Sequence, residues 1–141
     1  MLRRTYALVD LEKIAENIRE LKRCAGTGVM AVVKADAYGH GMVPVAKKAL
    51  QCGVTSFAVA TPDEAVGLRK AVPEGMILVL SPVEREAYPA LIAGEISLCA
   101  FEAWHLKEIA RSAAAAGKRA RVSSRMMSVS VRACERMSRK L

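Results

Sequence analysis

Two hydrophobic periods alternate along the chain. From Leu11 to Leu21, apolar residues recur at the three- and four-residue spacing of one helix face, and Asp10 before them is of a type that caps helices. Glycines at 26 and 28 end that pattern. Residues 29–33, VMAVV, are instead uniformly apolar, as in a short strand that is covered on both faces. The pattern therefore predicts a helix followed by a buried strand of a parallel sheet.

The same alternation repeats as far as residue 122. We expect further helices at about 44–50, 62–71, 82–92 and 102–116, and strands at 57–60, 76–80, 96–100 and 120–122. Both Thr61–Glu64 and Ser81–Glu84 place a hydroxyl, then Pro, then Glu three positions after the hydroxyl, which is typical of a capped helix start. Alternating strands and helices imply parallel pairing with right-handed crossovers, in a doubly wound sheet or a barrel.

The absence of nucleotide-binding glycine motifs after the expected strands favours the barrel. Neither a G-x-G-x-x-G fingerprint nor a P-loop follows any expected strand, which argues against a dinucleotide- or nucleotide-binding sheet. The predicted fold class is therefore α/β, a partial (β/α)8 TIM barrel with about four strand-helix units and the start of a fifth.

Composition fits one globular unit. The chain has 141 residues, of which 52% are hydrophobic and 26% charged. Its apolar runs are shorter than the roughly 18 residues of a membrane span, and the N-terminus reaches Asp10 without a secretory signal pattern. We expect a cytoplasmic protein with no membrane partner. The four cysteines show neither metal-ligand nor disulfide-framework spacing, so no metal is expected.

The net charge of +8 is unevenly distributed. Residues 123–141 hold five basic residues and one acidic residue, which is half of the net charge. The chain has six aromatic residues, and none is interleaved with this basic cluster, so the base-stacking surface typical of RNA or single-stranded DNA binding is missing. We therefore expect no nucleic-acid partner.

Candidate chemistry lies between the first strand and the next helix. Lys34 follows the apolar strand, and the carboxyl ends of strands are where ligands bind in such folds. Partial desolvation there favours the neutral amine that attacks an aldehyde. Tyr38 offers a ring and a hydroxyl to the same ligand, Gly39 and Gly41 allow a tight turn, and a phosphate fits near the helix start. The alternative is a solvated Lys34 with a packing Tyr38.

The segment Ala31 to Gly41, AVVKADAYGHG, resembles the pyridoxal-phosphate attachment motif of the alanine racemase family. The sequence also resembles this family at Tyr6–Ile14, Gly53–Ala60 and Ile77–Leu80, so the resemblance covers residues 5 to about 122. It implies a barrel joined to a β-rich C-terminal domain, in a homodimer that interconverts L- and D-alanine, the D-alanine serving the cell wall.

The resemblance also implies site roles. By motif position, Lys34 would be the catalytic and cofactor-binding lysine that holds pyridoxal 5'-phosphate and acts as one of two bases, and Tyr38 would contact the cofactor phosphate. The family's second base is a tyrosine from the C-terminal domain of the partner subunit, and an arginine faces the pyridine nitrogen. Both belong to parts of the family pattern that this sequence does not match.

From Ser123 the sequence departs from the family pattern. We expect two parts, a partial barrel domain at 1–122 and an atypical basic tail at 123–141, which we interpret as a frameshift product of a truncated racemase; the alternative is a genuine basic helix or disordered extension. Two other functions stay open. One is a non-racemising pyridoxal-phosphate-binding barrel, and the other is an inactive fragment or basic interaction protein.

Overall fold

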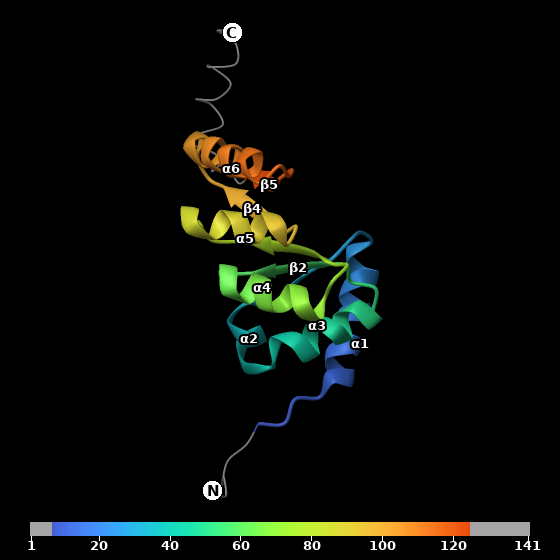
Figure 1. Ribbon diagram of the computed structural model, residues 1–141. Coiled ribbons are helices and arrows are strands. Elements are labelled where there is room, and N and C mark those ends of the chain that lie inside the picture. Colours follow the sequence, from blue (N-terminus) through green and yellow to red (C-terminus); the bar gives the residue numbers. More distant parts are fainter. Residues whose placement is uncertain (1–6, 125–141) are drawn as a thin grey trace, which may run out of the picture.

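Five parallel strands form one sheet whose spatial order, β1-β2-β3-β4-β5, is the order of the sequence (Figure 1). The computed structural model describes residues 7–124. The strands are β1 (Met30–Val32), β2 (Ser56–Val59), β3 (Met76–Val79), β4 (Ser97–Ala100) and β5 (Arg121–Ser124). The helices are α1 (Leu11–Ala25), α2 (Lys34–Gly39), α3 (Met42–Gln51), α4 (Pro62–Ala71), α5 (Tyr88–Ala93) and α6 (Ala103–Ala115), with a 3-10 turn η1 (Arg85–Ala87). The predicted alternation of parallel strands and helices is confirmed.

Local sequence signals fix two helix starts as predicted. The Asp10 carboxylate accepts the N–H groups of Glu12 and Lys13 at 2.9 and 3.2 Å, and so caps α1. At α4 the Thr61 hydroxyl accepts the Glu64 N–H at 3.3 Å while the Glu64 carboxylate accepts the Thr61 N–H at 3.2 Å. This reciprocal pair is the predicted capping box, and it sets where the chain turns from β2 into α4.

The expected helix at 82–92 was wrong in its first half. Residues 82–84 are not helical, η1 follows, and α5 begins only at Tyr88. Pro89 explains the difference, because a proline inside a longer helix would clash with the carbonyl four residues earlier, whereas it is tolerated in the first turn, where it lies in α5. Ser81 to Glu84 therefore form no capping box, and η1 has no side-chain cap.

The two faces of the sheet differ in what covers them. Side chains such as Phe57, Ile77 and Leu98 point to the face on which the helices pack, and they form the main core with buried residues of α4 and α5 such as Leu68 and Leu91. Alternate residues point to the opposite face, where the buried Ala58, Leu78 and Cys99 form a smaller cluster with Met76, Leu80 and Phe101. Helices on one face of a curling parallel sheet are the arrangement of a (β/α) barrel.

The last described strand crosses the predicted domain boundary. Strand β5 pairs with β4, with Leu98 opposite Val122 and Ala100 opposite Ser124, so the parallel ladder continues two residues beyond 122. The remainder of the predicted basic tail, 125–141, lies outside the described residues.

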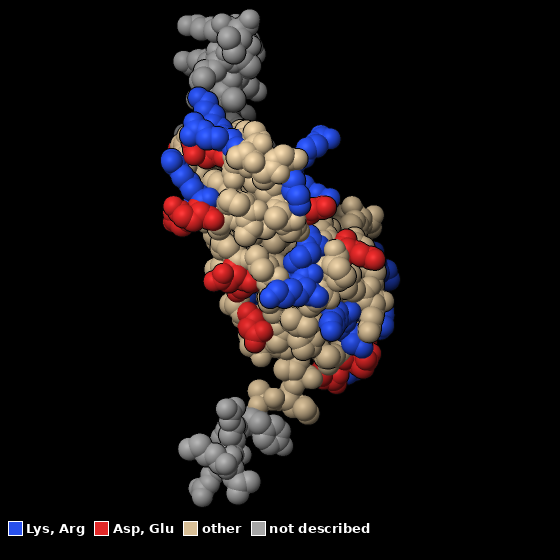
Figure 2. Space-filling view, in the orientation of Figure 1, with Lys and Arg blue, Asp and Glu red and all other residues tan. Residues whose placement is uncertain are grey.

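Charged side chains of both signs are mixed over the face seen in Figure 2. Surface ion pairs such as Lys48–Glu12 at 2.6 Å and Arg121–Glu95 at 2.7 Å interleave the two signs locally. Within residues 7–124, none of the helices has the length and apolar character needed to cross a lipid bilayer.

Candidate functional site

The turn that follows β1 is left-handed. Residues 35–38 have φ between 51 and 54° and ψ between 41 and 48°, although none of them is glycine. Each such residue costs about 1–2 kcal/mol relative to the right-handed form, and asparagine and aspartate tolerate the region best. Asp36 is one of the four. Backbone strain of this kind persists only where the surroundings over-determine it, which marks the turn as a site of interest.

The left-handed turn brings the two predicted site residues together. Lys34 is half-buried at the carboxyl end of β1, and its Nζ lies 6.0 Å from the centroid of the Tyr38 ring, at the outer limit of a cation–π contact. Tyr38 is 67% exposed, so its ring and hydroxyl are available to a ligand. The amine and the phenol therefore face one region at the strand end, where a ligand is expected in this architecture.

Hydrogen bonds within the segment hold the turn and start the next helix. The Asp36 carboxylate accepts the Met42 N–H at 2.6 Å, and His40 Nδ1 lies 2.9 Å from the Ala37 carbonyl. Gly39 and Gly41 have φ of 84 and 88°, values that glycine adopts without strain, as predicted for a tight turn. Because Asp36 already occupies the Met42 N–H, a phosphate at the start of α3 could use this N–H only by displacing the carboxylate.

A neighbouring strand end contributes Glu64, which sequence analysis treated only as a helix cap. Its Oε1 accepts the Ala35 N–H at 2.7 Å, and its Oε2 accepts the Ala60 and Thr61 N–H groups at 2.8 and 3.2 Å. Burial on its own raises the pKa of the Glu64 carboxyl, but the three backbone N–H bonds and the Lys34 charge outweigh burial, so the pKa lies below its ordinary value. Glu64 is therefore ionised at neutral pH.

Sequence reasoning missed this second role for a definite reason. The T-x-x-E pattern at the end of β2 signals a cap, but the bond to Ala35 depends on β2 lying beside β1, with Ala58 opposite Val32. Strand neighbours of a parallel sheet are not encoded in a local pattern. The expectation of strands adjacent in sequence order was the only available signal.

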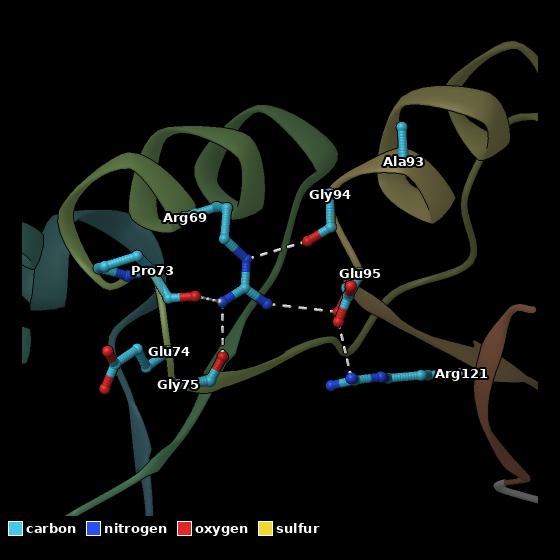
Figure 3. A pocket seen from close by; sticks show the side chains of 8 residues that line it. All are labelled: Arg69, Pro73, Glu74, Gly75, Ala93, Gly94, Glu95 and Arg121. Carbon is cyan, nitrogen blue, oxygen red and sulfur yellow. Dashed lines mark hydrogen bonds and ion pairs between the residues drawn. The ribbon is translucent and has the colours of Figure 1, made fainter. Parts of the chain in front are cut away.

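A cavity lies at the opposite end of the sheet (Figure 3). Its volume is about 430 Å3, and its walls include Gly75 before β3, Glu95 before β4 and Arg121 at the start of β5. Arg69 also lines the cavity. Burial lowers the pKa of its guanidinium; the Glu95 charge raises this pKa, and the Arg121 charge lowers it. Residues at the amino ends of barrel strands serve mainly stability.

Arg69 binds the loops around this cavity. Its Nε donates to the Gly94 carbonyl at 3.0 Å, and Nη1 lies 2.6 to 3.1 Å from the carbonyls of Val72, Pro73 and Gly75. Nη2 donates to the Glu95 carbonyl at 3.3 Å. Figure 3 shows the side chain reaching from α4 to the loop after α5. Most donors of the guanidinium are thus committed to the protein backbone, and we assign the cavity a structural role.

Taken together, the fold and the strand-end residues define a class of protein: a (β/α)-barrel domain with a lysine and a tyrosine at the mouth of its first strand. The comparison of sequences narrows the class to one family. The sequence model described as alanine racemase, N-terminal domain, matches residues 9–126. The chain belongs to this family.

Relatives support the assignment over most of the chain. The alanine racemase of Geobacillus stearothermophilus is 47% identical over 109 residues, which is 75% of this chain and 28% of that protein. Alanine racemase 1 of Bacillus subtilis (strain 168) is 42% identical over 111 residues, 77% of this chain and 28% of the relative. The chain thus spans about a third of the length of the curated relatives it matches.

Solved structures confirm the predicted partial barrel. The alanine racemase from Streptomyces coelicolor A3(2) superposes with a TM-score of 0.72 at 35% identity, covering 82% of this chain and 32% of that one. The alanine racemase from Bacillus anthracis with bound L-Ala-P gives a TM-score of 0.70 at 37% identity, covering 82% and 30%. The five-stranded sheet therefore corresponds to part of the N-terminal barrel of these enzymes.

Proposed function

We propose that this chain forms the part of a pyridoxal-phosphate-dependent alanine racemase that holds the cofactor, with Lys34 as the attachment residue. The observation that carries the proposal is the placement of Lys34 at the carboxyl end of β1, directly before a left-handed turn that brings Tyr38 near it. Family membership over residues 9–126 supports it.

The residues present fit this cofactor in two respects. Lys34 supplies a half-buried primary amine for the aldehyde carbon, and Tyr38 supplies an exposed phenol as a hydrogen-bond donor to a phosphate. The first N–H of α3 is committed to Asp36, so the remaining phosphate donors must come from groups other than that N–H.

The reaction assigns Lys34 a second task. When bound, the cofactor spreads the negative charge that develops at the alanine α-carbon over its conjugated ring. Lys34, set at one side of the site, would take or return the α-proton from that side. Racemisation also needs a base on the opposite side, which under this proposal comes from a partner subunit in a homodimer.

A non-racemising cofactor-binding role is the second candidate, because cofactor attachment needs the Lys34 amine whereas racemisation also needs a second base. The chain spans about 30% of the length of its alanine racemase relatives, and Lys34 lies within the matched part. Under this alternative, the cofactor would bind at Lys34 while alanine keeps its handedness.

Cofactor trapping tests the shared part of both candidates. The chain is incubated with pyridoxal phosphate, reduced with borohydride and digested, and the labelled peptide is identified by mass spectrometry. We expect the label on Lys34, and its loss in Lys34→Ala; a label elsewhere, or unchanged labelling in the variant, would contradict the assignment. Polarimetric or coupled assay of D-alanine formation then separates racemisation from binding alone.

A further inference from the structure

We propose that Glu64 is a positioning residue for Lys34, through which the end of β2 holds the left-handed turn in the conformation that presents the amine. The inference rests on the proposed function, because it concerns the same lysine. The evidence for it is the number of hydrogen bonds that Glu64 accepts, the residues that donate them, and the charge of the carboxylate.

The carboxylate makes more bonds than a helix cap requires. In a capping box the glutamate accepts one bond, from the N–H of the cap residue, and Oε2 accepts that bond from Thr61. Two further N–H groups donate to Glu64: Ala60 at 2.8 Å and Ala35 at 2.7 Å. Both are shorter than the capping bond at 3.2 Å, so the contacts that do not cap the helix are the tighter ones.

The bond to Ala35 falls at the start of the left-handed turn. Ala35 directly follows Lys34 and is the first residue of the left-handed turn, with φ of 51°. Its N–H reaches Glu64, 29 positions along the chain, whereas the next turn contacts, such as Ala37 N–H to Val33 carbonyl at 3.0 Å, stay within the segment. Glu64, in the first turn of α4, is thus the partner from another element that fixes the entry into the turn, and with it the direction in which Lys34 leaves the backbone.

Charge reinforces this geometry. Glu64 is ionised, and a bond from a backbone N–H to a carboxylate is stronger than one to a neutral acceptor. The Lys34 charge is among the groups that act on Glu64, so the lysine side chain lies within electrostatic reach of the same carboxylate. A glutamine would keep the length of the side chain, but it would turn one acceptor into a donor and remove the charge.

The test compares Glu64→Gln with a matched cap variant, Thr61→Ala. The latter removes the hydroxyl that caps α4 and leaves the Glu64 carboxylate in place. In the 15N-labelled full chain, amide exchange is followed at Ala35 and in the first turn of α4. We expect exchange at Ala35 to accelerate at least about tenfold in Glu64→Gln and to change little in Thr61→Ala, which loosens α4 alone. This measurement needs no cofactor.

Pyridoxal phosphate is the probe of the second measurement. We expect its apparent Kd to rise about tenfold in Glu64→Gln at protein concentrations and temperatures where circular dichroism shows the fold retained, and to stay within about twofold in Thr61→Ala. Labelling of Lys34 in the wild-type chain together with unchanged Kd and Ala35 exchange in Glu64→Gln would overturn the inference. Failure of the wild-type chain to label at Lys34 would instead overturn the proposed function, and accelerated exchange at Ala35 would still support the role of Glu64 in holding the turn.

Discussion

Replacing Arg69 by methionine should destabilise the domain without touching the candidate site. Five backbone carbonyls lie within 2.6 to 3.3 Å of its guanidinium, three of them around Nη1, which has only two hydrogens. At most four full hydrogen bonds therefore exist. Hydrogen bonds to a charged group contribute about 1.5–3 kcal/mol each when buried, but these carbonyls line an open cavity where water can replace the donor.

We therefore expect a net loss of about 2–3 kcal/mol in the free energy of unfolding for Arg69→Met. For a domain of this size that corresponds to a decrease of about 10 °C in Tm. Urea unfolding followed by circular dichroism gives the free energy, and differential scanning calorimetry gives Tm. Arg69→Lys keeps the charge and three donors, so we expect it to lose about half as much.

The matched control is Arg111→Met on α6. Arg111 makes one ion pair, with Glu108 at 3.4 Å, and its side chain is 77% exposed. Such pairs contribute less than about 1 kcal/mol, so this variant should unfold close to the wild type. Equal stabilities of Arg69→Met and Arg111→Met would refute the reasoning that the backbone contacts of Arg69 stabilise the loops around the cavity.

Three further outcomes are expected. Asp10→Ala removes the cap of α1 and should lower the free energy of unfolding by about 1 kcal/mol, measured by urea titration, while an unchanged midpoint would argue against the cap. Ala35→Val places a β-branched residue at φ 51° and should destabilise the chain by more than about 1 kcal/mol, whereas Ala35→Gly should be neutral or stabilising; the reverse order would contradict the left-handed assignment. The pKa of Glu64 is lowered in the folded state, so its contribution to the free energy of unfolding is fully present above the unfolded-state pKa and is lost as the pH falls through the folded-state pKa. In Glu64→Gln, the free energy of unfolding should therefore depend less on pH on the acid side, as measured by urea unfolding at several pH values.

The sequence allowed those elements to be predicted whose signals are local. The capping residue Asp10, the T-x-x-E box at the start of α4 and the uniformly apolar strands act through neighbours along the chain, and the corresponding elements lie where the pattern placed them. Pro89 carried a local signal that should have shortened the expected helix at 82–92, because its missing N–H and its ring are compatible only with a first turn.

For the candidate site, the sequence predicted where Lys34 and Tyr38 lie in the fold but not the backbone geometry between them. The motif placed Lys34 and Tyr38 at a strand end, where they lie. The opposite hand of the turn between them could not be inferred, because propensity rules disfavour four successive residues at positive φ. The bond in which Glu64 accepts the Ala35 N–H was equally hidden, since it joins the first turn of α4 to the turn after β1 and no local sequence pattern pairs these two segments.

The reversed hand of the turn limits how this lysine can be transplanted. Grafting the eleven-residue motif onto the first strand of another barrel would transfer the glycines and Asp36. It would not transfer the Glu64 carboxylate in α4, which accepts the N–H of the first residue of the turn. In a host without an acid at that place, the segment should relax to the common right-handed form and direct its amine elsewhere. The smallest transferable unit is therefore two successive strands with the start of the helix after the second.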